Sequence, residues 1–338
     1  MSKVIIGTGH DLPEWVISND DLEAMGVDFD RAKAGKSLDE WAMAHAGIHV
    51  RHRVRPGEGT SDMGARAARR AVEDAGLQLS DIGLVVVSTF TSDYRAPNTG
   101  GLIQAELGMT CKVFQVDSAC SGFIDATLMA ASLMDYMSVK YALVISSDAV
   151  SQYNVPTDFR QQTLFADGSG AVVLKNEPDS PYGLKAFHAV GDGKNRLVGV
   201  AMGGKVPLTE ENLRAGKQYI HWRPREVYPF ATAKMAESAQ IVVERAGWKM
   251  EDVRWFVPHQ TGRNIILDMA RVLNVPEDRV LINIDHTGNT SGASIPICLD
   301  EFNRKGIFKD GDKIVMPTMG AGMAWGALAF VWQDYKAL

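Results

Sequence analysis

The sequence predicts an α/β protein assembled from two halves of the same topology. Residues 82–88 form a continuous apolar run, which is typical of a strand in a parallel sheet covered on both faces. The segment 71–82, a helix and a glycine leading into that strand, returns as 242–253 at an offset of 171 residues. Valine, glutamate, alanine, glycine and aspartate match identically between the copies. One such match can arise by chance, but an offset of half the chain indicates a duplicated α/β unit.

The remaining elements follow the same plan. The polar stretch 176–181 is the best linker, so we place the halves at 1–176 and 182–338. Residues 26–37 are polar and read as a surface insertion. Helices are expected from Ser18 and over 60–75, 100–107 and 123–134, with another from Ile295, and strands at 3–6, 49–55, 82–88, 113–116, 141–145, 171–174, 255–257 and 282–285.

Composition excludes several classes of function. The chain has 338 residues, 46% of them hydrophobic, and a net charge of −6, so no basic excess is present to bind nucleic acid. The N-terminus lacks the architecture of a signal peptide, and no apolar run is long enough to cross a bilayer, which favours a soluble cytoplasmic protein.

The sequence offers no clear metal or redox motif. The three cysteines form no CxxC pair, and His49 with His52 is better explained as a solvated strand face than as a metal site. The first strand ends in Gly7-Thr8-Gly9, and this sequence lacks the third glycine of a dinucleotide site.

Cys120 stands where the strand 113–116 passes through a small polar turn into an almost wholly apolar helix. A thiol at a helix N-terminus is favoured as the nucleophilic thiolate. A buried structural role is the commoner outcome for a lone cysteine in an apolar context, so this segment alone leaves both interpretations open.

Two polar residues in the second half favour the nucleophile. His259 follows the strand 255–257, at the carboxyl end where α/β sheets bind their ligands. Asn289 lies in a turn between the expected strand 282–285 and the next helix, the same local arrangement as at Cys120, although a helix N-cap is the simpler role for it. Related turns of a duplicated fold meet at the shared interface. A thiol with two neutral donors beside it suits acyl transfer.

The motifs resemble those of the thiolase superfamily, and within it the β-ketoacyl-acyl-carrier-protein synthase III group. They occur in the family's order over nearly the whole chain. The carrying motifs are Asp117–Gly122, Pro258–Gln260, Gly288–Ser294 and Gly320–Gly326, with support from Gly7–Gly9, Asp39–Trp41, Pro156–Asp158 and Phe165–Ala171.

The resemblance implies a layered αβαβα fold and a homodimer. It implies that Cys120 takes an acyl group from a primer thioester, and that His259 and Asn289 bind the carbonyl of a malonyl thioester as CO₂ leaves. The backbone N–H groups of Cys120 and Ala321 would form an oxyanion hole. Phe165 would separate the two half-reactions, and Trp41 would stack on the adenine of coenzyme A. The substrates would be acyl-CoA and malonyl-carrier protein or malonyl-CoA, with no permanently bound cofactor and no metal, in fatty acid or polyketide synthesis.

The departures from the family concern the primer and its carrier. Relatives usually have an arginine directly after Pro-Thr-Asp, but this chain has Phe159 there and Arg160 one position later. The asparagine usual at the pantetheine site is replaced by Gly262.

Ala96 stands where short-primer enzymes have a bulky residue in the wall of the acyl pocket, which favours medium or branched primers. Arg263 and Arg271 are the best candidates for docking an acidic carrier protein. The helix that bears Trp41 has His45 in place of an arginine, and Ala321 lies in a turn that is usually all glycine.

Other acyl-transfer enzymes fit less well. A degradative thiolase would carry a second cysteine in the turn 320–326, which has none. A hydroxymethylglutaryl synthase would need a glutamate base near Cys120, and a plant-type polyketide synthase is usually longer. Two alternatives stay open: an acyltransferase that esterifies or amidates an acceptor with His259 as general base, and a paralogue that only binds acyl thioesters.

Overall fold

The computed structural model describes residues 2–335. Its first half contains β1 (Ser2–Asp11), β2 (Trp15–Ser18), α1 (Asn19–Ala24), α2 (Arg31–Ala34), α3 (Leu38–His45), β3 (Val50–Arg53), α4 (Thr60–Asp74), β4 (Leu84–Ser88), α5 (Thr99–Glu106), β5 (Lys112–Val116), α6 (Gly122–Tyr136), β6 (Tyr141–Ala149), α7 (Phe159–Leu164) and β7 (Asp167–Glu177). The second contains β8 (Gly183–Gly191), β9 (Val198–Val200), α8 (Glu210–Arg214), β10 (Ile220–Trp222), α9 (Pro224–Arg245), β11 (Trp255–Phe256), α10 (Arg263–Val272), α11 (Ile284–Thr287), α12 (Ser294–Arg304), β12 (Lys313–Gly320) and β13 (Ala324–Val331).

The two main sheets have the same topology. The first has the strand order β1-β7-β6-β4-β5, and the second has β8-β13-β12-β11, with Val280 bridging to Phe256 on the outer side of β11. In both sheets the first two pairings are antiparallel and the following ones parallel. The boundaries 1–176 and 182–338 stay a prediction, although β7 ends at Glu177 and β8 begins at Gly183.

The repeated sequence segment has the same local structure in each half. Gly76 and Gly247 both end a helix with a left-handed backbone, at φ of 66° and 69°. In each copy the matching aspartate then caps a short turn: the Asp81 carboxylate accepts the N–H of Gln78 at 2.8 Å, and Asp252 accepts that of Lys249 at 3.0 Å. The identical residues are therefore those that make the helix end and the turn.

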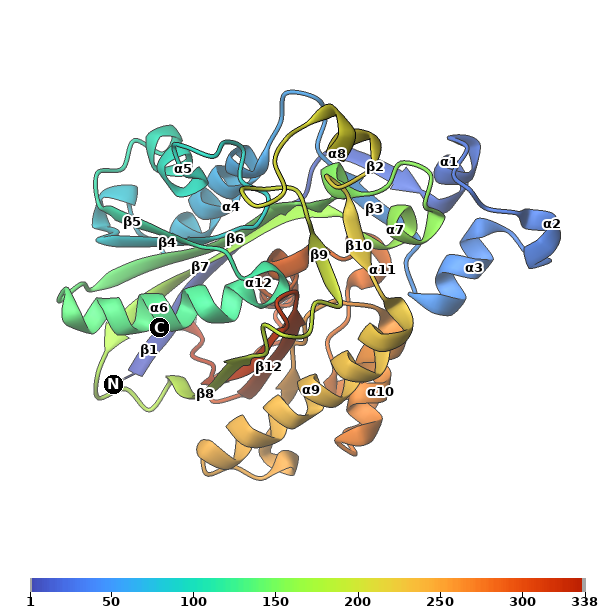
Figure 1. Cartoon of the computed structure of the whole chain (residues 1–338). Helices are drawn as coiled ribbons and strands as arrows, with labels where there is room; N and C mark the ends of the chain where they lie inside the picture. Colours follow the sequence, from blue (N-terminus) through green and yellow to red (C-terminus); the bar gives the residue numbers. More distant parts are fainter. Residues whose placement is uncertain (1, 336–338) are drawn as a thin grey trace.

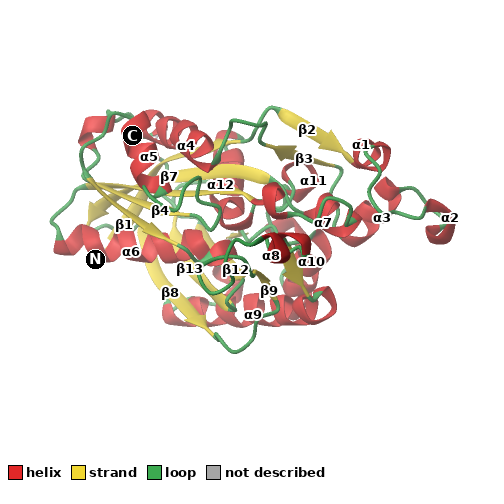
Figure 2. Ribbon diagram, turned by 45° about the horizontal axis from the view of Figure 1, so that its top comes forward, coloured by secondary structure: helices red, strands yellow, loops and turns green. Residues whose placement is uncertain are grey.

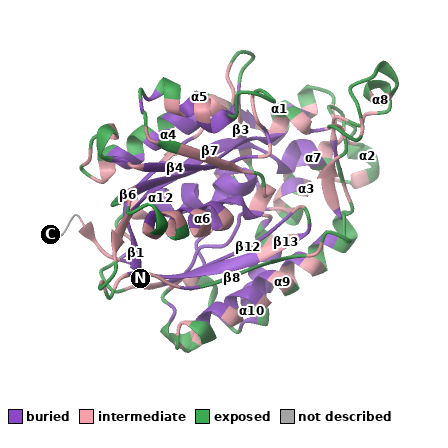
Figure 3. Ribbon diagram, turned by 60° about the vertical axis from the view of Figure 1, so that its left-hand side comes forward, coloured by how far each residue is buried: buried purple, intermediate pink, exposed green. Residues whose placement is uncertain are grey.

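The elements form five layers, α-β-α-β-α (Figure 1). Helices α4 and α5 cover the outer face of the first sheet, α6 and α12 lie between the sheets, and α9 and α10 cover the outer face of the second. Figure 2 shows the strands running between these helices, and Figure 3 shows buried residues along the strands and along the middle-layer helices, with some intermediate positions on α6. This explains why α6 is apolar on nearly all sides.

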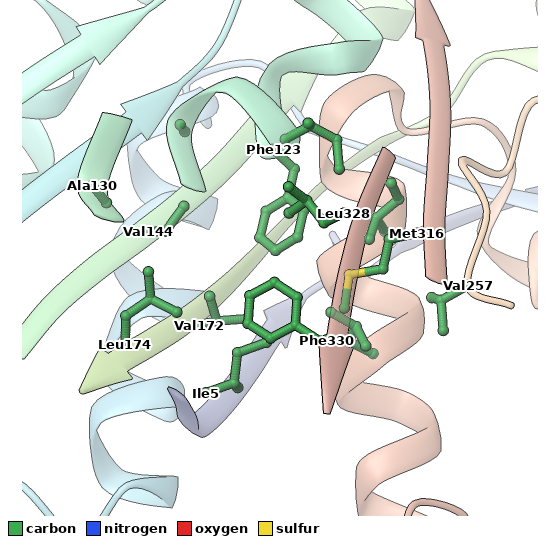
Figure 4. Packing of buried hydrophobic residues seen from close by; sticks show 14 of the residues in the cluster. Ile5, Phe123, Ala130, Val144, Val172, Leu174, Val257, Met316, Leu328 and Phe330 are labelled. Carbon is green, nitrogen blue, oxygen red and sulfur yellow. The ribbon is translucent and has the colours of Figure 1, made fainter. Parts of the chain in front are cut away.

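The central core joins side chains from both halves (Figure 4). Phe123 of α6 packs with Leu328 of β13, and Phe330 of β13 lies beside Ile5 and Val172 of the first sheet. Each of these side chains is at least 96% buried. Because apolar burial is the main favourable term in folding, the two halves are expected to be stable only together.

The strand expected at 3–6, ending in Gly7-Thr8-Gly9, is longer in the structure. β1 continues to Asp11, with Gly7 and Gly9 inside it. Helix α4 crosses β1 so closely that a Cβ atom on either glycine would collide with the backbone of Ala71. The glycine pair therefore permits close contact between the helix and the strand.

The strand expected at 282–285 does not form. The chain meets β11 two residues earlier, at Val280, and then turns into α11. The fully buried side chain of Gln260 accepts the N–H of Asn283 at 3.1 Å, so it takes a backbone donor that a neighbouring strand would use. A side chain from a distant segment thus overrides the alternating apolar pattern.

The smaller elements gather at one side of the layers. Helices α1, α2 and α3 project outwards, and α7, β9 and β10 lie near them beside the ends of the sheets (Figure 1). The stretch 26–37, expected to be a surface insertion, contains the exposed helix α2. Across the residues described, no helix combines the length and the apolar character that crossing a membrane requires.

The contact between α4 and β1 gives a stability prediction. Replacing Gly9 by alanine should lower the free energy of unfolding by about 1–3 kcal/mol, because the added methyl group overpacks the crossing. Gly193→Ala is the matched control, since a Cβ there meets nothing within 4 Å, and it should change stability by less than about 0.5 kcal/mol. Urea unfolding followed by tryptophan fluorescence measures both; equal unfolding midpoints for the two variants would show that the crossing is not tight.

Candidate active site

Cys120 lies in a short 3-10 helix, Ala119–Ser121, between β5 and α6. Ala119 before it has φ of 45°, a conformation that is uncommon for a residue with a side chain and recurs at functional turns. The end of β12 approaches the turn from the second half: Thr318 Oγ1 donates to the Cys120 carbonyl oxygen at 2.9 Å. A Cβ on Gly320 would lie 3.0 Å from the Cys120 nitrogen, so only glycine allows this approach.

The matching turn of the second half is built in the same way. Ser291–Ala293 is a 3-10 helix before α12, and Ser291 has φ of 55°. The two turns touch, because a Cβ on Gly292 would lie 2.8 Å from the Ala119 carbonyl oxygen. The duplicated turns therefore meet at the centre of the molecule, as expected of Cys120 and Asn289.

Asn289 is held rigidly at this junction. Its N–H donates to the Leu164 carbonyl at 3.0 Å, and its own carbonyl accepts the Ala166 N–H at 2.9 Å. Its side-chain Oδ1 accepts the Ser291 N–H at 2.9 Å. Because the oxygen is occupied, the amide NH₂ group is the part of the side chain left to act as a donor. The same backbone bonds fix Phe165, which lies between Leu164 and Ala166.

His259 follows β11 and is 99% buried. Its backbone N–H donates to the Pro317 carbonyl of β12 at 2.9 Å, which fixes the position of the residue. Its Nδ1 lies 2.7 Å from Ser294 Oγ, which also accepts the Gln260 N–H at 3.2 Å. Burial lowers the pKa of the imidazole to about 3, so His259 is neutral at physiological pH.

The Cys120 thiol is shifted in the opposite sense. Burial raises its pKa to about 11, while the Ser291 hydroxyl and the backbone N–H groups of Cys120 and Ala321 act to lower it. The helix N-terminus was expected to favour the thiolate, but removal from water outweighs the nearby donors in the resting protein. The backbone N–H groups of Cys120 and Ala321 nevertheless both act on the sulfur, and these are the two donors predicted for the oxyanion hole.

A buried carboxylate lies behind the two turns. Asp148 at the end of β6 is fully buried, and its side chain accepts hydrogen bonds from Thr89 Oγ1 at 3.0 Å and from the N–H groups of Phe90 at 3.1 Å and Gly292 at 3.3 Å. Burial raises its pKa to about 7. It thus joins the first half to the 3-10 turn of the second.

A cavity of about 310 Å³ opens onto the Cys120 thiol. Its walls are mostly apolar, which suits a thin, uncharged arm. Trp41 lines it with one ring face stacked on His45 at 4.2 Å and its edge on Phe159 at 4.9 Å. The predicted site residues that line it are Cys120, His259, Asn289, Phe165, Ala321, Trp41, Arg160 and Gly262. Arg263 is exposed next to Gly262 and is not among the lining residues.

A second cavity, of about 760 Å³, adjoins the first. The two share the walls made by Cys120, Phe165, Val198 and Ala321. His259 and Asn289 line only the first cavity. The segment 196–206, apart from Val198, lines only the second, as do Ile220 and His221 of β10, whereas Trp222 of β10 lines the first. Phe165 therefore stands between two spaces that both reach the thiol.

Ala96 lies elsewhere. It is exposed in the loop between β4 and α5 and lines neither cavity of the chain. Within one chain the space next to Cys120 is instead bounded by the 196–206 segment. Ala96 thus does not bound the acyl pocket within a single chain, and its expected role stays a prediction for an assembly.

Sequence reasoning missed three residues that hold the site together. Ser294 contacts His259, Ser291 lies beside the thiol, and Asp148 links the turns. Ser291 and Ser294 belong to the quoted motif 288–294, but no spacing connects them to His259 or Cys120. Asp148 did carry a signal, because three polar residues, 146–148, end an otherwise apolar strand.

Two family models match the chain. The model for 3-oxoacyl-[acyl-carrier-protein] synthase III matches residues 114–193, and the model for its C-terminal region matches residues 243–332. These ranges contain Cys120, His259 and Asn289.

Curated relatives and solved structures agree with the models. The chain is 37% identical over 334 residues to a β-ketoacyl-[acyl-carrier-protein] synthase III of Cereibacter sphaeroides, covering 97% of this chain and 98% of the relative. It is 38% identical over 326 residues to a synthase III of Neisseria gonorrhoeae, covering 96% and 97%. The crystal structure of 3-oxoacyl-[acyl-carrier-protein] synthase III from Aquifex aeolicus VF5 is similar with a TM-score of 0.87 and 34% identity, covering 98% of this chain and all of that one. The priming β-ketosynthase of the R1128 polyketide pathway is similar with a TM-score of 0.89 and 28% identity, covering 98% and 97%.

The raised pKa of Cys120 predicts how its reactivity depends on pH. Only the thiolate is alkylated by iodoacetamide, so the rate at Cys120 should keep rising with pH towards about 11, well past the value near 8.5 of an ordinary thiol. Ser291→Ala removes a donor that stabilises the thiolate and should shift the profile higher still. Peptide mass spectrometry gives the rate at Cys120, with Cys111 in the same digest as the control that Ser291→Ala should not affect. A profile that saturates near pH 8 would contradict the assigned environment.

Proposed function

The chain belongs to the β-ketoacyl-[acyl-carrier-protein] synthase III family, a family of condensing acyltransferases, and we propose that Cys120, His259 and Asn289 carry its chemistry. The observation that carries the proposal is that these three residues line one cavity while the acyl side of Cys120 opens into another. One thiol thereby serves two half-reactions in two adjoining spaces. The product is a 3-oxoacyl thioester of fatty acid or polyketide type.

The first half-reaction is thioester exchange on Cys120. The sulfur attacks the primer carbonyl, the carrier thiol leaves with the proton, and the acyl group stays on the protein. The N–H groups of Cys120 and Ala321 both act on this sulfur, so they are placed for the oxyanion that forms beside it. Because Gly320 has no side chain, the end of β12 can lie against the Cys120 backbone, and this close contact places the next residue, Ala321, beside the sulfur.

The second half-reaction decarboxylates a malonyl thioester. Ser294 accepts the Gln260 N–H and donates its own proton to His259 Nδ1, so the remaining ring nitrogen carries a proton towards the cavity. The Asn289 amide supplies a second N–H, because its oxygen is held by Ser291. Two neutral donors stabilise the enolate oxygen as CO₂ leaves. A neutral His259 is required for this, which its low pKa provides. The enolate carbon then attacks the acyl carbon, the bond from that carbon to Cys120 Sγ breaks, and Cys120 leaves as a thiolate that takes a proton from water.

The first cavity is the proposed route of the carrier arm. Its apolar walls suit a pantetheine chain, with Trp41, Arg160 and Gly262 along it. The exposed Arg263 at the start of α10 is the proposed contact for an acidic acyl carrier protein. Trp41 is already stacked on His45 and met by Phe159, so its ring is less open to a coenzyme A adenine than the resemblance implies.

A homodimer is part of the proposal. β5 is the outer strand of the first sheet, and its residues 113–116 are only half-buried. An edge strand with unpaired backbone groups and half-buried apolar side chains is suited to pairing with a second copy.

Substitutions separate the half-reactions. Cys120→Ser should abolish the acyl-enzyme, whereas Cys111→Ser, the matched control at a half-buried thiol, should leave it intact. His259→Ala and Asn289→Ala should each slow malonyl decarboxylation by about 10²–10³-fold and leave most of the acylation of Cys120. Intact-protein mass spectrometry follows acylation, and CO₂ release from malonyl-carrier protein follows the second step. Product formation that survives Asn289→Ala but stops with His259→Ala would instead support transfer to an alcohol or amine.

A further inference from the structure

The second cavity is the space that an acyl group on Cys120 must enter. His259 and Asn289 line only the first cavity, so an extender thioester that reaches them fills that side. The acyl chain on the Cys120 sulfur would then occupy the second cavity, on the other side of Phe165. A volume of about 760 Å³ is within the range of small-molecule sites.

The walls of this cavity differ in kind. Apolar side chains contributed by several elements line one part of it: Phe90, Val150, Val200 and Ile220. The segment 196–206 and β10 add three basic residues, Arg196, Lys205 and His221. Arg196 and Lys205 are exposed where they line the cavity, so their charges stay hydrated and can meet a charged end of a bound acyl group.

The two strong cations are unpaired. Among the residues that the structure describes, no carboxylate lies within ion-pairing distance of Arg196 or Lys205, although many other surface cations of the chain are paired. The one acidic residue of the lining is Asp117, which comes from the turn before Cys120 and pairs with neither cation. The charged groups of the cavity therefore leave a net positive charge.

The segment that carries these cations is tied to the site. Asp192 exchanges backbone hydrogen bonds with Met323, at 2.7 Å and 3.0 Å, next to the turn that holds Ala321. β9 pairs with β10 through Val198–Val200, and the Met202 N–H donates to the Lys217 carbonyl at 3.0 Å. Arg196 and Lys205 thus lie in the segments before and after β9, which is itself paired with β10 beside the cavity.

We propose that the second cavity binds primer acyl groups that end in a carboxylate, with Arg196 and Lys205 pairing with that carboxylate. The inference rests on the proposed acyl-enzyme at Cys120 and names the class of primer: a monothioester of a dicarboxylic acid. The step is thioester exchange. Cys120 Sγ forms a bond to the acyl carbon, the bond to the carrier sulfur breaks, and the carrier leaves as a free thiol with the Cys120 proton.

The test compares thioesters matched in chain length. Adipoyl-CoA is set against hexanoyl-CoA, and suberyl-CoA against octanoyl-CoA, and intact-protein mass spectrometry gives the second-order rate of Cys120 acylation. The wild-type protein should react at least ten times faster with each dicarboxylic member. Arg196→Gln and Lys205→Gln should slow the dicarboxylic reaction about tenfold and leave the alkyl reaction within twofold.

Charge reversal sharpens the result. Lys205→Glu should invert the preference towards hexanoyl-CoA, whereas Lys194→Gln, an exposed control in the same segment but outside the cavity wall, should change nothing. A wild-type preference for the alkyl thioesters, or an equal loss of both reactions in the variants, would overturn the inference. Absence of acylation by all four thioesters, or acylation at another cysteine, would overturn the proposed function itself.

Discussion

The site depends on one steric constraint: the turns of two duplicated halves pack against each other with no side chain between them. Gly320 lies against the Cys120 backbone, and Gly292 against the Ala119 carbonyl. Ala119 and Ser291 adopt left-handed backbones on the two sides of the contact. Such conformations cost of order 1–3 kcal/mol each and persist only when the surroundings enforce them. Here the buried sheets and the two middle helices provide that enforcement, so the thiol is placed by the whole fold rather than by its own turn.

Burial then determines the charge state of the reacting groups. Removal from water lowers the pKa of the His259 imidazole, which keeps it neutral, and raises the pKa of the Cys120 thiol, which keeps it protonated. The proposed catalytic residues would therefore act through preformed hydrogen bonds rather than as an ion pair. Ser294 is central to this, because its single hydroxyl orients the imidazole. A buried site built from neutral donors avoids the cost of holding charges in an apolar interior.

The sequence predicted most of the fold because the repeat, the apolar strands and the helix ends are local signals. It was wrong at 282–285, where a distant group overrides the local pattern: the Gln260 side chain accepts the Asn283 N–H and no strand forms. The placement of Cys120, His259 and Asn289 in one cavity was expected, but their supporting residues were not, since hydrogen bonds between distant segments leave no spacing pattern. Arg196 and Lys205 escaped notice for the same reason, because a surface cation and a cavity cation look alike in sequence.

The central claim is that His259 and Asn289 stabilise one developing oxyanion together. A double-mutant cycle on malonyl decarboxylation tests it directly, with His259→Ala, Asn289→Ala and the double variant compared by CO₂ release. Groups that act as a unit are strongly non-additive, so the double variant should be little slower than the worse single variant. Losses that multiply fully would show that the two residues act on separate steps and would contradict the account.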